Sequence, residues 1–225
     1  METKLTLLKS KNYMNKIILV AVTVLISILN LHAEKIEGTI IFKNDSSVHV
    51  TFEIPKTLSG EINYPTLQEK IVYYNVLNKK TRLKPDQVKE IKFRFKDEDI
   101  RMISFASIPY HIPFSTPAGY ILLRNIIAGK LKLFIFYSSY GPAGMYIGPG
   151  SKWRGKSGDV ELIVLQKNND ELFKPRFTKE NFKEDMRVYL SDCPSLVQKI
   201  DNDLYSIDDI RQIVTDYNTN CDAEK

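Results

Sequence analysis

A short apolar run near the N-terminus determines which part of the chain can fold as a globular protein. The run spans residues 17–29, follows four lysines, and precedes the small residue Ala33. A basic segment, a short apolar core and a small closing residue form the pattern of a cleavable export signal. The sequence therefore predicts a signal peptide over residues 1–33, cut after Ala33, and a folded part that begins at Glu34.

A membrane anchor is the alternative interpretation of the same segment. The apolar run has 13 residues, whereas a helix needs about 20 apolar residues to span the bilayer core. The pattern thus favours the signal, and with it an exported protein in the periplasm or at the surface of a bacterial cell. Met14 would also begin a compact signal, so a start at Met1 and a start at Met14 both stay open.

Charge gives no sign of a nucleic-acid partner once residues 1–33 are set aside. The remaining 192 residues carry 28 basic and 26 acidic residues, interleaved along the chain. Nucleic-acid binding depends on a clustered basic surface that neutralises phosphates. One basic cluster occurs at residues 79–84, and a solvated turn explains it better than a phosphate site. We expect neither a nucleic acid nor a nucleotide as partner.

Two cysteines, Cys193 and Cys221, lie near the C-terminus. An exported chain meets oxidising conditions, in which an even number of cysteines favours pairing. The sequence therefore predicts one disulfide, although two free buried thiols are the alternative.

Alternating apolar and polar residues predict a β-rich body. Residues 34–107 contain several alternating segments separated by turn residues, which is typical of a small antiparallel sheet that is curled or forms a half-barrel. A proline-rich connector then precedes a second β region, which contains a β-hairpin. Strands of this second region are expected at residues 120–127, 131–137 and 159–166.

Helical periodicity replaces this alternation after Thr178. Pro194 suits the first turn of a second helix, and Ser206 with Asp209 resembles a capping box before a third. The predicted fold class is α+β, an antiparallel β-rich body with a disulfide-linked C-terminal helical cap. Its expected parts are a signal peptide (1–33), a β subdomain (34–107), a proline-rich connector and second β region with a glycine-rich loop (108–177), and the cap (178–225).

The C-terminal segment resembles uncharacterised exported proteins of Bacteroidetes. The resemblance rests on Asp192-Cys193-Pro194, with Leu196 two residues later, and on Tyr217-Asn218 before Cys221. In such proteins a D-C-P-x-L segment leads to a Y-N-x-x-C ending. The resemblance implies an exported protein of similar architecture and implies no activity.

Tests for catalytic or cofactor chemistry give no candidate residues. Residues 150–157 match the phosphate-loop pattern G-x-x-x-x-G-K-[ST], but that loop needs a following helix, and the residues that follow alternate as in a strand. His49 and His111 have no ligand partners at metal spacing. Acidic clusters at 97–99 and 208–209 are typical of a turn and a helix start. We therefore predict no catalytic residue, no metal site and no cofactor.

The glycine-rich segment 141–158 contains six of the ten glycines, and we expect it to form a long loop. Aromatic residues and a methionine in and next to it could contact a partner protein, a glycan or a lipid interface. They could equally fold back over the sheet. These possible contact residues are Tyr140, Met145, Tyr146 and Trp153.

These features favour a non-enzymatic binding or structural module of the cell envelope. Two alternatives remain open. One is a hydrolase-type enzyme that uses carboxylates which the sequence does not identify. The other is a periplasmic subunit that adds a strand to the sheet of another protein, for which residues 131–137 are the candidate strand.

Overall fold

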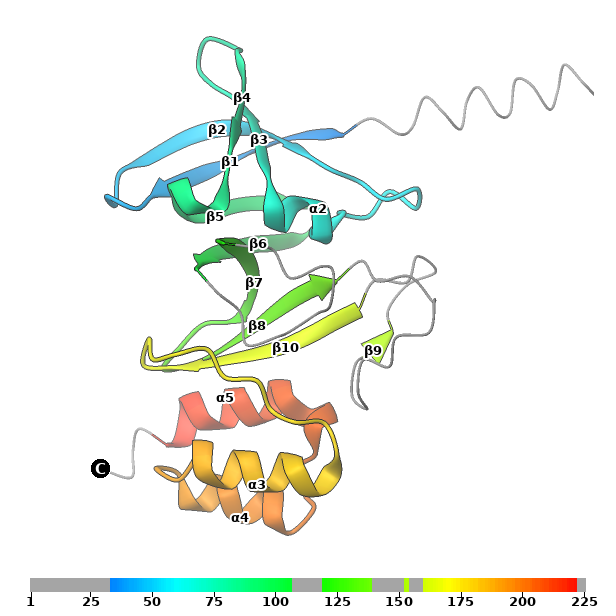
Figure 1. The fold of residues 1–225 in the computed structure, drawn as a ribbon, viewed down its shortest axis with the longest axis vertical. Helices are drawn as coiled ribbons and strands as arrows, with labels where there is room; N and C mark the ends of the chain where they lie inside the picture. Colours follow the sequence, from blue (N-terminus) through cyan, green and yellow to red (C-terminus); the bar gives the residue numbers. More distant parts are fainter. Residues whose placement is uncertain (1–32, 107–118, 139–151, 154–159, 222–225) are drawn as a thin grey trace, which may run out of the picture.

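The computed structural model describes residues 33–106, 119–138, 152–153 and 160–221, and shows an α+β protein (Figure 1). Within these residues, ten antiparallel strands form one open sheet in the order β4-β3-β2-β1-β5-β6-β7-β8-β10-β9. The strands are β1 (Glu34–Phe42), β2 (Ser47–Ile54), β3 (Ile71–Tyr74), β4 (Lys80–Leu83), β5 (Val88–Phe95), β6 (Glu98–Phe105), β7 (Ile121–Ile127), β8 (Leu131–Ser138), β9 (Lys152–Trp153) and β10 (Val160–Lys167).

Helices occupy two places in the chain. One lies between β2 and β3, and the others follow β10. The α-helices of the described residues are α2 (Tyr64–Glu69), α3 (Lys179–Tyr189), α4 (Pro194–Asp201) and α5 (Ile210–Asn220), with short 3₁₀ turns η1 (Pro85–Gln87) and η2 (Ile207–Asp209).

The first half of the sheet encloses its own core. Alternate residues of β1, β2, β5 and β6 point inward, which leaves side chains such as Ile40, Phe52 and Ile91 with no exposed surface. Gly38 allows β1 to lie close to β5, since a Cβ atom there would stand 2.3 Å from the carbonyl oxygen of Lys92. The antiparallel, curled body predicted for residues 34–107 is confirmed.

One sheet runs through both of the predicted β regions. β6 pairs with β7, and Met102 lies opposite Arg124. The prolines of the expected connector, in residues 107–118, lie outside the described residues. The strands expected at 120–127, 131–137 and 159–166 are confirmed as β7, β8 and β10.

The predicted helical cap and its disulfide are confirmed. In Figure 1, α3, α4 and α5 gather at the end of the molecule next to β10, and Phe182, Met186 and Ile213 pack in one core with Leu133. Cys193 and Cys221 are joined. The capping box of Ser206 and Asp209 is also present, at the start of η2.

Three local expectations are wrong. Residues 64–69, within the part predicted to hold only strands and turns, form α2, because Pro65 lies in the first turn, where proline favours a helix, and the side chain of Asn63 caps it. Residues 80–83 form the edge strand β4, although their charges resemble a solvated turn. Within the expected glycine-rich loop, Lys152 and Trp153 form the short strand β9, which pairs with β10. Glycines of the loop lie on both sides of β9 in the sequence.

Candidate functional site

A cleft of about 420 Å³ lies between the segment that leads into α2 and the turn that joins β5 to β6. It combines aromatic rings with side chains of both charges. The lining residues are Glu61, Ile62, Tyr64, Phe95, Lys96, Asp97, Glu98 and Arg124. A volume of this size falls within the range of about 300–1,000 Å³ that is typical of small-molecule sites.

Arg124 of β7 forms the inner wall of the cleft. Its side chain is 14% exposed, donates a hydrogen bond from Nη1 to the hydroxyl of Tyr137 at 2.9 Å, and forms an ion pair with Glu98. Burial by itself lowers the pKa of Arg124, but Tyr137, Tyr64 and Glu98 outweigh this effect and raise that pKa. The guanidinium group is therefore positively charged at every physiological pH.

Two stacked tyrosines lie beside this guanidinium group. The rings of Tyr64 and Tyr137 are 4.3 Å apart and almost parallel, and Arg124 lies over the Tyr64 ring at 4.8 Å. Burial raises the pKa of Tyr137 to about 12 and raises that of Tyr64 as well. Both hydroxyl groups are therefore neutral at pH 7, when each can donate and accept hydrogen bonds.

Gln68 of α2 fixes the position of this cluster on the sheet. Its Nε2 donates to the Tyr137 carbonyl oxygen at 2.8 Å, and its Oε1 accepts from the Tyr137 amide at 2.7 Å. Because Gln68 is 1% exposed, these bonds are shielded from water. α2 thus holds Tyr64 over β7 and β8, which it contacts directly.

The rim of the cleft carries opposite charges from the β5–β6 turn. Lys96 has a positive φ of 55°, which tightens the turn, and its Nζ lies 2.6 Å from the carboxylate of Glu61. Asp97 is the next residue of the turn, and β6 begins at Glu98, earlier than the predicted turn of residues 97–99 suggests. The cleft therefore offers hydrogen-bond donors and acceptors around an aromatic surface.

The structure describes some of the residues proposed from the sequence and not others. Tyr140, Met145, Tyr146 and His111 lie outside the described residues, and of Trp153 the structure describes the backbone pairing with Val160. The phosphate-loop match is followed by β10, as the alternation predicts. β8, proposed for strand addition, lies between β7 and β10, so it is not a free edge.

The described residues contain neither a metal-binding cluster nor a membrane-spanning helix. Within the ranges given above, no group of three or more His, Cys, Asp and Glu side chains is placed to hold a metal ion. No helix in those ranges has the length and the apolar character that a membrane-spanning helix requires.

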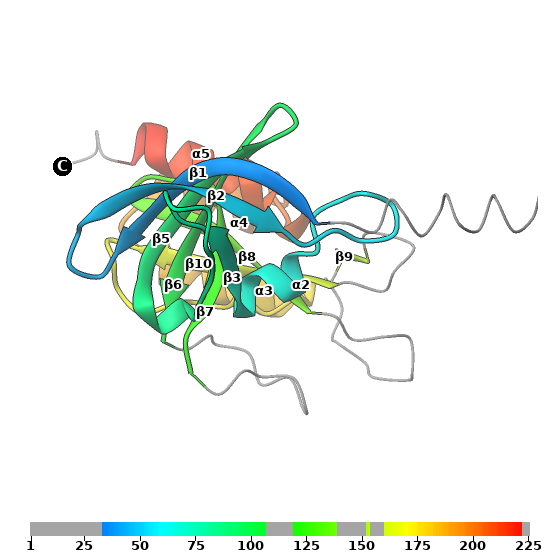
Figure 2. The same cartoon turned by 90° about the horizontal axis from the view of Figure 1, so that it is seen from above.

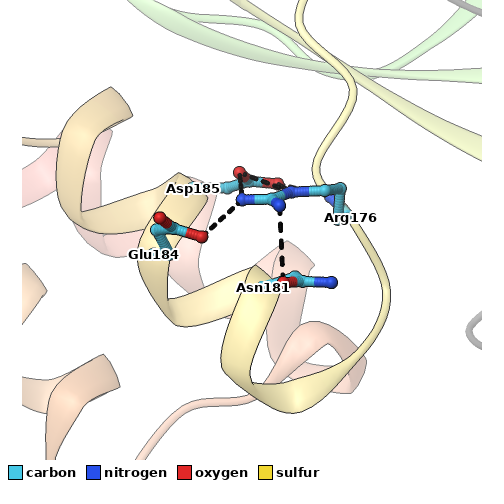
Figure 3. A network of polar contacts seen from close by, with 4 residues as sticks. All are labelled: Arg176, Asn181, Glu184 and Asp185. Carbon is cyan, nitrogen blue, oxygen red and sulfur yellow. Dashed lines mark hydrogen bonds and ion pairs between the residues drawn. The ribbon is translucent and has the colours of Figure 1, made fainter.

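A second polar network lies on the helical cap (Figure 3). Arg176 donates hydrogen bonds from Nη2 to Asp185 and Glu184, both at 2.7 Å, and from Nη1 to Asn181 at 3.4 Å. The bonds to Asp185 are the main cause of a raised Arg176 pKa. Because all three partners belong to α3 and Arg176 precedes it, the network holds the start of the cap in place.

Residues of the C-terminal motif, Asp192 and Asn218 among them, also serve packing. Asp192 accepts a hydrogen bond from the Tyr217 hydroxyl at 2.6 Å and pairs with Lys167 of β10. Asn218 bonds both the amide and the carbonyl of Leu131 in β8. The segment thus joins the cap to the sheet.

Comparison of the chain with protein-family models, curated proteins and solved structures finds no match. Sequence reasoning alone missed the cleft, because its walls come from segments up to about 60 residues apart. One signal was present: Arg124 is the single charged residue of β7, whose other side chains are apolar apart from Asn125. Such a residue needs a buried partner, and that partner was not identifiable from spacing.

Proposed function

We propose that this protein is a non-enzymatic binding module of the bacterial cell envelope, related to the exported proteins of Bacteroidetes, and that it binds an uncharged carbohydrate in the Arg124 cleft. The cleft lining carries the proposal. A sugar hydroxyl donates one hydrogen bond and accepts two, so it suits a surface that presents both kinds of group. Arg124 and Lys96 supply donors, while Asp97 and Glu98 supply acceptors.

The aromatic part of the lining supports the same ligand class. Tyr64 offers an apolar ring with a polar hydroxyl, a combination that suits a partner with alternating apolar and polar surface. Cationic groups at the cleft are balanced by Glu98 and Glu61, which disfavours a strongly anionic ligand. A neutral polyhydroxylated ring satisfies all of these conditions.

A binding role fits the carboxylates better than catalysis does. Glycoside hydrolysis uses two carboxyl groups that flank the scissile bond and act directly on the sugar. Glu98 is held in an ion pair with Arg124, and Glu61 is held in one with Lys96. Both carboxylates therefore already have cationic partners in the protein, which suits a fixed binding surface better than a catalytic pair.

Export is supported by two features. The N-terminal pattern is that of a signal peptide, and the Cys193–Cys221 disulfide is typical of oxidising compartments such as the periplasm.

The test is a titration of the protein with cellobiose, maltose and chitobiose, in which binding is monitored by ligand-observed NMR, a method that detects weak binding. We expect at least one of them to bind, and Asp97→Ala to weaken that binding by about fivefold or more. Asp99→Ala is the matched control, because Asp99 lies in the same hairpin, is 87% exposed and does not line the cleft. Absence of binding by all three sugars, or equal losses in both variants, would reject the proposal.

A further inference from the structure

The hairpin of β3 and β4 carries two large apolar side chains into solvent. Val76 and Leu77, in the loop between the strands, are 88% and 83% exposed. Figure 1 shows this loop extending beyond the sheet at the end of the molecule opposite α3 and α4, which is the end that faces the viewer in Figure 2. The sheet's own core lies elsewhere and does not cover these residues.

The tip holds these side chains outward in a fixed conformation. Asn75 accepts hydrogen bonds at Oδ1 from the amides of Leu77 and Lys79, both at 3.0 Å. Its carbonyl oxygen accepts from the amide of Asn78, whose φ of 55° is the left-handed conformation that asparagine tolerates. The exposure of Val76 is therefore built into an ordered turn.

The charge around this tip has one sign. Residues 70–84 contain five basic residues and no acidic one. Lys80 pairs with Glu53 of β2 at 2.7 Å, whereas Lys79, Arg82 and Lys84 are exposed. Alternation along β4 sets Lys80 and Arg82 on one face of the hairpin, away from the core that Leu83 joins.

We propose that the β3–β4 tip docks the protein onto an anionic phospholipid bilayer. Val76 and Leu77 enter the boundary between headgroups and acyl chains, and the basic side chains approach the lipid phosphates. Apolar insertion combined with attraction between basic residues and anionic lipids is the arrangement by which peripheral proteins bind membranes. This inference is independent of the ligand proposed for the Arg124 cleft.

The test is flotation of the full chain, recovered from the producing cells, with vesicles. One set is pure phosphatidylcholine, and in the other roughly a third of the lipid is phosphatidylglycerol. We expect binding to the anionic vesicles, a loss of binding as salt rises from about 0.05 to 0.5 M, and a decrease of about tenfold or more in Leu77→Asp.

Leu204→Asp is the matched control, since Leu204 is 68% exposed and lies in the loop after α4, at the other end of the molecule. Parent and variants are recovered from the same cells and compared only when their intact masses show the same N-terminus, so residues 1–33 cannot produce a difference between them. Thermal unfolding of each variant establishes that it is folded. Equal losses in the two variants, equal binding to both vesicle types, or no binding by the parent would overturn the inference.

Discussion

Two side-chain amides complete the hydrogen bonding of β8 at its ends. The pairing of β7 with β8 runs from Arg124 opposite Ile135 to Ile127 opposite Leu133. Beyond these pairs, Gln68 of α2 bonds both backbone groups of Tyr137, and Asn218 of α5 bonds both backbone groups of Leu131. A primary amide carries the same donor and acceptor as a peptide group, so it can take the place of a strand partner.

Replacing Gln68 by leucine should destabilise the protein strongly. The change leaves the buried amide and carbonyl of Tyr137 without partners, at about 1–3 kcal/mol for each group. We expect the free energy of unfolding in urea to fall by about 2–4 kcal/mol. The exposed Gln198 is the control, and Gln198→Leu should change the free energy of unfolding by less than about 0.5 kcal/mol. Similar values for the two variants would show that the amide bonds contribute little.

At the level of elements, a disulfide links parts of the helical cap to one another, and polar contacts join the cap to the sheet. The disulfide connects the residue before α4 to the residue after α5. Lys199 of α4 and Tyr205 both bond Asp216 of α5, at 2.9 and 2.6 Å. These contacts fix the relative positions of α4 and α5, while Asn218 joins α5 to β8.

Removal of the disulfide should lower the stability of the cap. The bond closes a separation of 28 residues, and the chain-entropy model assigns about 3–4 kcal/mol to a loop of that length. The double variant Cys193→Ser, Cys221→Ser should lose about this amount in chemical denaturation, with native-like circular dichroism at low denaturant. A loss below about 1 kcal/mol would mean that the polar contacts alone hold the cap.

Acid should destabilise the same region. Four aspartates of the cap have a pKa below the ordinary 3.8 of this side chain: Asp185, Asp192, Asp203 and Asp216. For Asp216, hydrogen bonding by Tyr205 is the main cause of the lower pKa. For Asp192, burial by itself raises the pKa, and the bonds from Tyr217 and Lys167 outweigh it.

The sign of the effect follows from the lowered pKa values. Below pH 3.8 the unfolded chain binds protons that the folded chain still excludes, so stability is complete above that pH and falls as pH decreases through the folded values. Urea denaturation between pH 5 and about pH 2.5 should show this decrease. In Asp216→Asn, the free energy of unfolding should decrease less over the same pH range. Stability that is constant or rises on acidification would contradict this assignment.

Alternation and capping were sufficient to predict most elements from sequence, because each depends on near neighbours in the chain. β5 and β6 alternate clearly, and Ser206 with Asp209 marks a helix start. α2 was missed because it has six residues and contains Pro65. The cleft depends on packing of Tyr64 against Tyr137 and Arg124, which no local pattern encodes.

On the scale of the whole molecule, one sheet carries three separate features. The apolar β3–β4 tip lies at one end, the helical cap at the other, and the cleft is formed by α2, the β5–β6 turn and β7 in between. A bound carbohydrate in the cleft therefore need not compete with membrane docking at the tip.

Export of the chain should leave a mature protein that begins at or near Glu34, the first residue of β1. The intact mass of protein recovered from the producing cells measures this directly. A mass that includes residues 17–29 would instead indicate an N-terminal anchor, the alternative interpretation of that segment.

Carbohydrate binding in the Arg124 cleft can be located by mapping amide chemical shifts of the ¹⁵N-labelled protein during titration with cellobiose, maltose or chitobiose. We expect shifts concentrated at Ile62, Lys96 and Asp97, with the cap residue Ile213 unchanged. Shifts that are confined to the cap, or absent at saturating sugar, would contradict binding in the cleft.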